Sequence, residues 1–351
     1  MLQPILKEEF AISVSREPFL AHQVLFLDGL TGSGKTMMGP ILSSLARMEV
    51  QRMDHIHEHL CGVHFLGGIS EDAAVALIRM YTDLALYNVM IGRESNFRWK
   101  DLSGVLNNPR GLRYLWRLFE PDGDPVEGRI QKIQPILQIH AHQVLGIASP
   151  IFSALGDRLV LVEMIRYPLY LLEHWDSYIG RHGTDPRDFT VWFDHKGKAL
   201  PWFTRGWEEK YLAGNRMDRV IYAIDWITRR AEETLGSLDP AARRRVVVIP
   251  FERFVVAPWS YLQQVAGLLG TSVTPATRRV LKKQRVPRQL SVDGLDLDIY
   301  RRYRWIPPKK GTSEGLEMRR RWDETRQKAS KEGMQVLERI CAEYETRYWK
   351  P

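Results

Sequence analysis

The stretch 22-HQVLFLDGLTGSGKTMMGPIL-42 decides the fold. Residues 22–29 form a short apolar run ending in Asp-Gly, which is typical of a buried strand. The eight residues from Gly29 to Thr36 match the phosphate-binding pattern G-x-x-x-x-G-K-[ST] in full, and a helical pattern follows. A strand, a glycine loop and a helix in this order predict that backbone N–H groups and Lys35 bind a phosphate group.

The whole loop is a candidate binding site for a nucleotide. Lys35 supplies a mobile positive charge, and Thr36 has a hydroxyl that can bind Mg²⁺ or a phosphate oxygen. The loop alone does not tell an ATP-splitting enzyme from a protein that uses a nucleotide as a group carrier. The predicted contacts are Gly29, Leu30, Thr31, Gly32, Ser33, Gly34, Lys35 and Thr36.

Further strands and helices alternate along the chain. Three short runs, at 135–142, 158–166 and 244–252, are almost continuously apolar, as in a parallel sheet covered on both faces. Helical patterns at 168–180 and 216–236 separate them. This alternation predicts an α/β, three-layer P-loop fold with a central, mostly parallel sheet, helices on both faces and helical insertions.

No linker, repeat or low-complexity segment divides the chain. We therefore expect a single domain over residues 1–351, with a core at about 22–290 and a basic loop and helices at about 291–351. The aromatic stretch 189–207 breaks the alternation and could form a hairpin or a lid.

The composition limits the function classes. Of the 351 residues 44% are hydrophobic, and the formal net charge is +8. The positive charge suits a phosphorylated or acidic ligand, but Lys and Arg are spread along the chain, so no nucleic-acid partner is expected. Two distant cysteines indicate neither a disulfide framework nor a metal motif. No signal peptide and no run of roughly 20 apolar residues stands out, so a cytoplasmic location without a membrane segment is expected.

The ends of the other strand candidates do not favour ATP hydrolysis. A P-loop ATPase usually has a second strand ending in an Asp that helps to hold Mg²⁺. Here the runs end in histidines, in Arg166 and in Glu252. Glu163, within the second run, is the alternative ligand that keeps the ATPase interpretation open.

Several segments resemble sulfotransferases that use 3′-phosphoadenosine 5′-phosphosulfate (PAPS). The stretch 158-RLVLVEMIRYPLYLLEHWDSYIGR-181 is similar to the family's strand that ends in Arg-x-Pro before a helix. The stretch 244-RRVVVIPFERFVVAPWSYLQQVAGLLG-270 is similar to a second family segment, and 135-PILQIHAHQVL-145 to the strand that carries the family's histidine. The order of these motifs along the chain also agrees with the family.

The resemblance implies a role for each matching residue. The loop Gly29–Thr36 would hold the 5′-phosphosulfate end of PAPS, and Arg166 its 3′-phosphate. The family usually has a Ser eight residues after this Arg, whereas this chain has His174 there and Ser177 three residues later. The late basic loop that closes over the 3′-phosphate would be Lys309, Lys310 and Gly311.

The phosphate loop departs from the family at one position. Sulfotransferases usually have Lys or Arg where this chain has Gly32, and the charge sits instead at Lys35. Lys35 could reach the sulfonyl oxygens, or the change could indicate a nucleoside triphosphate.

Sulfuryl transfer needs a base for the acceptor hydroxyl and positive charge for the leaving phosphate. Lys35 fits the second role. His142 is the first candidate for the base, with His140 and Glu58 as rivals. His55 and His59 have the i, i+4 spacing of half a zinc site, but a solvated helix face is the preferred interpretation, and no metal is expected.

We therefore predict a PAPS-dependent sulfotransferase acting on a hydroxyl of a glycan, a lipid or a small metabolite. An ATP-dependent kinase or other P-loop NTPase is the alternative. A phosphate-loop protein with a binding or regulatory role is the third possibility.

Overall fold

A computed structural model of the protein describes residues 12–99, 101, 103–121, 123–289 and 312–349. Its centre is a five-stranded sheet with the strand order β2-β3-β1-β4-β7, and every neighbouring pair is parallel. The predicted α/β fold with a mostly parallel sheet is therefore confirmed. The strands are β1 (Gln23–Gly29), β2 (Arg52–Met53), β3 (Ile136–His140), β4 (Leu159–Ile165) and β7 (Val246–Pro250).

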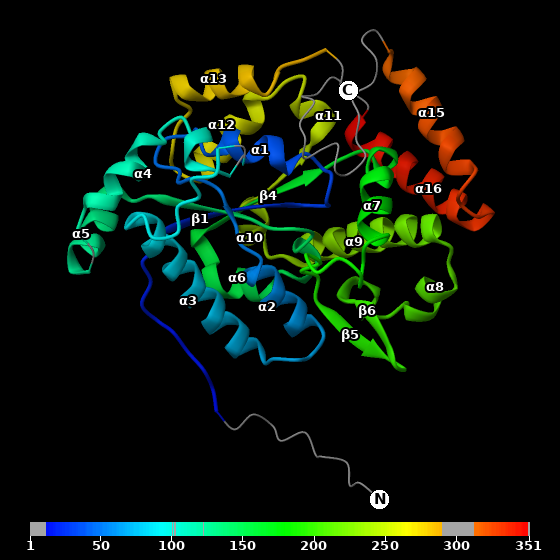
Figure 1. Ribbon diagram of the computed structural model, residues 1–351, viewed down its shortest axis with the longest axis horizontal. Coiled ribbons are helices and arrows are strands. Elements are labelled where there is room, and N and C mark those ends of the chain that lie inside the picture. Colours follow the sequence, from blue (N-terminus) through cyan, green and yellow to red (C-terminus); the bar gives the residue numbers. More distant parts are fainter. Residues whose placement is uncertain (1–11, 100, 102, 122, 290–311, 350–351) are drawn as a thin grey trace, which may run out of the picture.

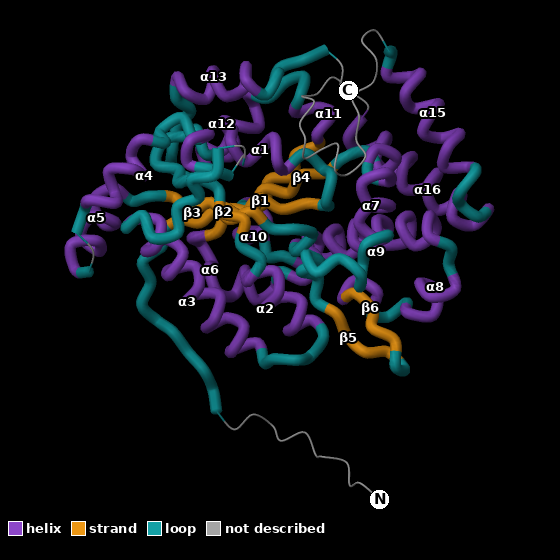
Figure 2. Tube along the Cα trace, in the orientation of Figure 1, coloured by secondary structure: helices purple, strands orange, loops and turns teal. Residues whose placement is uncertain are grey.

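Helices cover both faces of the sheet, as predicted (Figures 1 and 2). Alternate side chains of a strand point to opposite faces, so β1 contributes Leu25 and Leu27 to one buried cluster and Val24 and Phe26 to another. We call these the upper and the lower core, after their positions in Figure 1. Strands β1, β3, β4 and β7 are mostly apolar because both of their faces are buried.

The upper core lies under a small group of helices that follow the phosphate loop and β7. These helices are α1 (Lys35–Leu42), α11 (Phe251–Phe254), α12 (Trp259–Leu268) and α13 (Pro275–Lys283).

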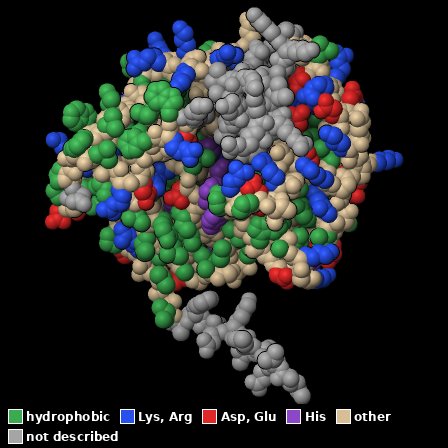
Figure 3. All heavy atoms as spheres, in the orientation of Figure 1, with side chains coloured by type: hydrophobic (Ala, Val, Ile, Leu, Met, Phe, Trp, Pro, Cys, Tyr) green, Lys and Arg blue, Asp and Glu red, His purple; other side chains and the backbone are tan. Residues whose placement is uncertain are grey.

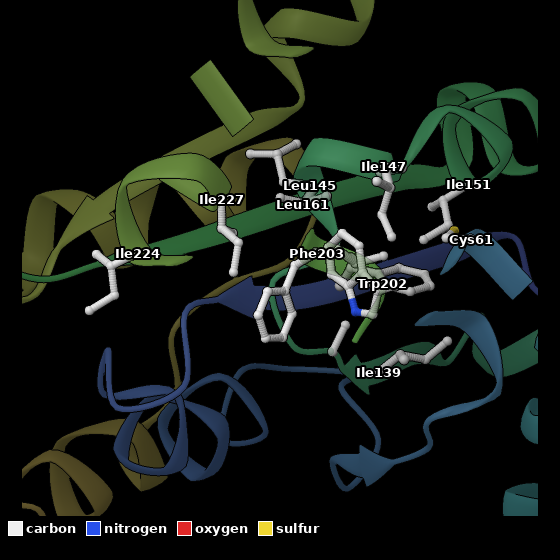
Figure 4. Close-up of a cluster of buried hydrophobic side chains, with 14 of the residues drawn as sticks. Cys61, Ile139, Leu145, Ile147, Ile151, Leu161, Trp202, Phe203, Ile224 and Ile227 are labelled. Carbon is white, nitrogen blue, oxygen red and sulfur yellow. The ribbon is translucent and has the colours of Figure 1, made fainter. Parts of the chain in front are cut away.

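The lower core is larger, and Figure 4 shows part of it, including Cys61, Ile139, Trp202 and Ile227. Helices from all parts of the chain contribute to it. They are α2 (Ile56–Phe65), α3 (Glu71–Met90), α5 (Asp124–Ile133), α6 (Ser149–Leu155), α7 (Leu172–Ile179), α8 (Glu208–Ala213), α9 (Arg216–Ser237) and α16 (Lys331–Tyr344).

The remaining elements lie at the periphery. The stretch 189–207 contains an antiparallel hairpin, the first of the two forms expected for it, made of β5 (Trp192–His195) and β6 (Lys198–Pro201). The other helices are α4 (Leu112–Trp116), α10 (Pro240–Arg244) and α15 (Glu314–Arg326). Within the described residues, no helix has both the length and the apolar composition needed to cross a membrane.

Helix α9 illustrates how the sequence sets these boundaries. It begins after Asn215, whose side-chain oxygen accepts a hydrogen bond from the N–H of Asp218. Val220, Ile224 and Ile227 then repeat at helical spacing and are buried in the lower core.

All five strands are parallel, so their carboxyl ends meet at one edge of the sheet. Gly29, His140, Ile165 and Pro250 end four of them, and the predicted site residues follow these ends in the chain. In parallel α/β sheets this edge is where ligands bind.

Candidate active site

The phosphate loop is held in a conformation that depends on its glycines. Gly29, Gly32 and Gly34 have φ values of 133°, 93° and 104°, which side-chain-bearing residues rarely adopt. A Cβ at Gly29 would lie 2.2 Å from the carbonyl oxygen of Met164, and one at Gly34 would lie 2.4 Å from the ring of Phe251. The loop is thus packed closely between the ends of β4 and β7.

Lys35 begins helix α1 and folds back over the loop. Its side chain is buried, and its Nζ donates hydrogen bonds to the carbonyl oxygens of Gly29 and Leu30, the latter at 3.1 Å. Burial lowers the pKa of Lys35, while the charges of Asp28 and Glu163 oppose the shift. To bind an anion on the loop, this ammonium group has only to turn from the carbonyls toward the anion.

Two carboxyl groups lie side by side behind the loop. Asp28 on β1 is in register with Glu163 on β4, and its Oδ2 accepts hydrogen bonds from the N–H groups of Val144 and Leu145 at 2.8 and 2.7 Å. Burial, and then the charge of Asp28, raise the pKa of Glu163 well above its ordinary value. The raised pKa disfavours the ionised form of Glu163, which is the form that a Mg²⁺ ligand needs.

His142 and Glu58 form a pair at the side of the phosphate loop. Glu58, on α2, accepts hydrogen bonds at Oε2 from the backbone N–H of His142 at 2.8 Å and from its Nδ1 at 3.2 Å. His55, just before α2, bonds through its own Nδ1 to the other oxygen, Oε1. The two imidazole rings stack with their centroids 5.3 Å apart. One carboxylate thus orients two histidines.

The charge states of this group follow from its contacts. The bonds from the two histidines outweigh burial and hold the pKa of Glu58 well below its usual value. The same carboxylate raises the pKa of His55. Glu58 is therefore ionised. The side chain of His142 is 22% exposed, so a ligand in solution can reach it.

His140, the other histidine considered as the base, is more deeply buried than His142. It ends β3, is 3% exposed, and its ring lies 5.3 Å from that of His142. Burial, reinforced by His142 and Lys35, lowers the pKa of His140 well below its usual value. His140 is thus a neutral ring behind His142, and it does not line the pocket described below.

The segment 54-DHIHEH-59 corrects a prediction. We expected its helix face to be solvated, but Glu58 is only 14% exposed and His57 is fully buried, with its Nε2 at 3.1 Å from the hydroxyl of Thr82. The reason is tertiary packing, because α2 lies against α3 and α6 on the lower core. His59 reaches the carbonyl oxygen of Phe189 through Nε2 at 2.6 Å.

The structure brings Arg166 and His174 against the phosphate loop itself. Arg166 donates from Nη1 to the carbonyl oxygen of Gly32 at 3.0 Å, and its guanidinium lies over the ring of Phe251 at 4.4 Å. A Cβ at Gly32 would lie 3.3 Å from the side chain of His174. Burial lowers the pKa of His174 to about 3, so this ring is neutral.

The other residues assigned to the 3′-phosphate are not brought to the loop in the same way. Ser177 is buried and accepts a hydrogen bond at Oγ from Nη2 of Arg181 at 3.2 Å. Lys309, Lys310 and Gly311 lie outside the described residues.

A pocket of about 320 Å³ opens beside the loop, and Figure 3 shows histidine side chains in the hollow at the centre of this face. Thr31 of the loop forms one part of its wall, and Glu58 and His142 form another. His55, noted in the sequence for its zinc-like spacing, also lines it, and so do Phe189 and Trp202 of the aromatic stretch 189–207. The sequence analysis did not single out four other lining residues, Gln143, Tyr178, Arg181 and His182. The aromatic stretch 189–207 was the only signal in the sequence for part of this wall.

The comparisons with known proteins found similar solved structures only. No family model matches the chain, and no curated protein matches its sequence significantly. The structure is similar to a sulfotransferase domain from the curacin biosynthetic pathway, at 12% identity over 88% of this chain and 98% of that one, with a TM-score of 0.41. It is also similar to a sulfotransferase domain of the Synechococcus PCC 7002 olefin synthase (12% identity, 89% and 98% covered, TM-score 0.40). A third similar structure is a sulfotransferase from Mycobacterium avium, at 12% identity over 93% of this chain and 77% of that one, with a TM-score of 0.38.

Proposed function

We propose that the protein is a sulfotransferase that moves a sulfuryl group from PAPS to a hydroxyl group. The observation that carries the proposal is that one pocket is lined both by Thr31 of the phosphate loop and by the His142–Glu58 pair. A group bound at the loop and an acceptor in the pocket would therefore meet beside a base.

His142 is the base in this proposal. Neutral imidazole carries one proton, and the carboxylate of Glu58 favours that proton on Nδ1. Nε2 is then free to accept the proton of the acceptor hydroxyl, as the acceptor oxygen bonds to sulfur and the bond from sulfur to the phosphate oxygen breaks. Glu58 stabilises the imidazolium that forms, which is the part an acid plays in a Ser-His-Asp triad.

Lys35 and the loop neutralise the charge that develops on the leaving phosphate. The Nζ of Lys35 already lies over the loop, and the positive φ values leave room for backbone N–H groups to face an anion. Ser33 can also donate a hydrogen bond to an anion on the loop, because its Oγ is buried and has no hydrogen-bond partner within the described residues. Lys35 thus takes the place of the charge that Gly32 lacks.

Arg166 is the residue that we assign to the 3′-phosphate. It lies at the end of β4 beside the loop, where its guanidinium can exchange the carbonyl oxygen of Gly32 for a phosphate oxygen. His174 stands at the family's Ser position and is neutral, so it contributes at most one N–H to a phosphate. Ser177 is the weaker candidate because Arg181 already bonds to it.

The second candidate function is an ATP-dependent kinase or NTPase. The full G-x-x-x-x-G-K-T loop, with Thr36 at the Mg²⁺ position, favours it. Two observations weigh against it. Strand β3, next to β1, ends in His140, and burial beside Asp28 raises the pKa of Glu163.

The proposal is tested with ³⁵S-labelled PAPS and a panel of hydroxyl acceptors, each with the product nucleotide measured. We expect transfer to at least one acceptor, and tight binding of adenosine 3′,5′-bisphosphate (PAP) that Lys35→Met abolishes. Lys282→Met, which changes an exposed lysine on α13, is the matched control and should bind PAP like the parent. Failure of the parent to bind PAP would overturn the proposal.

A further inference from the structure

Three side chains with metal-binding atoms converge in the pocket. The atoms in question are one imidazole nitrogen each of His55 and His142 and a carboxylate oxygen of Glu58, and all lie within 4.8 Å of one another. They come from two places in the chain, the start of α2 and the end of β3, so the tertiary fold has built this group. Within the described residues it is the only such cluster of three or more His, Cys, Asp or Glu side chains.

The arrangement requires little movement to bind an ion. Both histidines already direct Nδ1 toward the same carboxylate, and their rings are nearly parallel, with an interplanar angle of 16°. Ligand atoms around a Zn²⁺ ion lie about 2.0–2.2 Å from the metal. An ion would take the place of the protons that now join the two rings to the carboxylate, and the atoms of His55 and Glu58 would move slightly apart to admit it. The side chains are partly buried, which favours ligands that are held in place.

The donor set decides which ions fit. Two imidazoles and one carboxylate suit Zn²⁺, Co²⁺ and related transition-metal ions, whereas Mg²⁺ and Ca²⁺ prefer oxygen ligands alone. Three protein ligands also leave at least one coordination position open, and all three residues line the pocket. Nearby Lys35 adds positive charge and Asp54 negative charge, so the surroundings do not exclude a cation.

We propose that His55, Glu58 and His142 bind a divalent transition-metal ion such as Zn²⁺, and that the bound ion inhibits sulfuryl transfer. The second half rests on the proposed function. The reason is the position of one proton: a metal on Nδ1 of His142 leaves the proton of the neutral ring on Nε2. Nε2 then donates instead of accepting, and His142 cannot take the proton of the acceptor. The ion also occupies the oxygens of Glu58 that orient the ring.

The binding half is tested with the full chain, Zn²⁺ and a chromophoric chelator as competitor, and with Co²⁺ followed by its visible absorption. We expect one equivalent to bind to the parent. His55→Ala and Glu58→Gln should each weaken binding by on the order of tenfold or more, since changes even outside the direct ligands of a metal cost that much. His64→Ala is the matched control, because His64 lies on the same helix outside the cluster, and it should bind like the parent.

No binding to the parent, or equal weakening in His64→Ala, would overturn the site. Thermal melting of each variant shows whether it is folded, and His55→Asn replaces His55→Ala should the alanine variant melt early. These measurements need no acceptor, so they stand whatever the outcome of the transfer assay.

The inhibitory half is tested by adding Zn²⁺ to the transfer assay, with PAP binding measured in parallel. We expect the rate of the parent to fall as the site fills while PAP binding is kept, and the residual activity of His55→Ala to be less sensitive to Zn²⁺. Full activity of the zinc-loaded parent would overturn the inhibition but leave the site. Zinc binding without any transfer in the metal-free protein would count against the proposed function instead.

Discussion

Two glutamates, nine residues apart in the chain, have different surroundings. Glu49 is fully buried, and its carboxylate accepts hydrogen bonds from Arg113, Arg117 and the hydroxyl of Tyr114 at 2.8–3.0 Å. Glu58 is 14% exposed and bonds to His55 and His142. In both cases the partners outweigh burial and lower the pKa of the carboxyl group.

The difference lies in what the partners can do. Arginines stay charged at any ordinary pH, so the group around Glu49 has one charge state and no route for a proton. Histidines gain and lose a proton near neutrality, and those at Glu58 line a pocket beside a phosphate loop. Of the two carboxylates, only Glu58 has partners that can exchange protons and that face a cavity, which makes it the candidate for a functional site.

The largest expected effect is on catalysis at Glu58. Glu58→Gln should lower the rate of sulfuryl transfer by about 10²–10⁴-fold, because the amide no longer fixes the proton of His142 on Nδ1 or stabilises the imidazolium. PAP binding should stay within a few-fold of the parent. If Glu49→Gln, assayed per folded molecule, loses as much activity as Glu58→Gln, the proposed difference between the two carboxylates is wrong.

His142→Ala should produce a loss of similar size while PAP binding is kept. His140→Ala should lower the rate less, because that ring is buried behind His142 and outside the pocket lining. Transfer rates of the two variants, measured with the same acceptor, decide whether His142 or His140 is the base. Retained turnover in His142→Ala would move the base to Glu58 or His140.

The next effect is on stability at Glu49. Glu49→Gln should lower the free energy of unfolding by about 3–5 kcal/mol, because it leaves the buried guanidinium of Arg117 and the partly exposed one of Arg113 without their carboxylate. Urea denaturation measures this. Glu94→Gln is the control, since it breaks a more exposed pair with Arg52 and should cost less than about 1 kcal/mol. An equal loss of unfolding free energy in the two variants would show that the network of Glu49, Arg113 and Arg117 adds no more stability than an exposed ion pair.

The smallest effect is on the acid dependence of stability. Because the pKa of Glu49 is lowered in the folded protein, its contribution is present above the unfolded pKa of about 4.3 and is lost as the pH falls through the folded value. The parent should therefore lose more stability than Glu49→Gln between about pH 5 and pH 2. Parallel curves of unfolding free energy against pH would contradict this.

The fold could be predicted because its signals are local. The glycine loop lies between a strand and a helix within twenty residues, and β4 and β7 are almost continuous apolar runs. The hairpin around Gly197 was expected as one of two forms for the same reason.

The site could be predicted only in part. His142 and Glu58 were both candidates for the base, but their contact joins residues 84 positions apart, and no local pattern encodes it. The same is true of His55, which was assigned to a solvated face because its own segment is polar. Arg181 was missed since an arginine on a polar turn has no distinctive pattern before the pocket is built around it.

We propose that the phosphate loop binds a sulfate donor and not a nucleoside triphosphate. Calorimetric titration of the parent with PAP in the absence of metal, and with ATP plus Mg²⁺, tests this most directly. We predict that PAP binds without metal, that Arg166→Ala weakens it, and that ATP with Mg²⁺ binds far more weakly. Tight binding of ATP with Mg²⁺ together with no detectable binding of PAP would contradict the account.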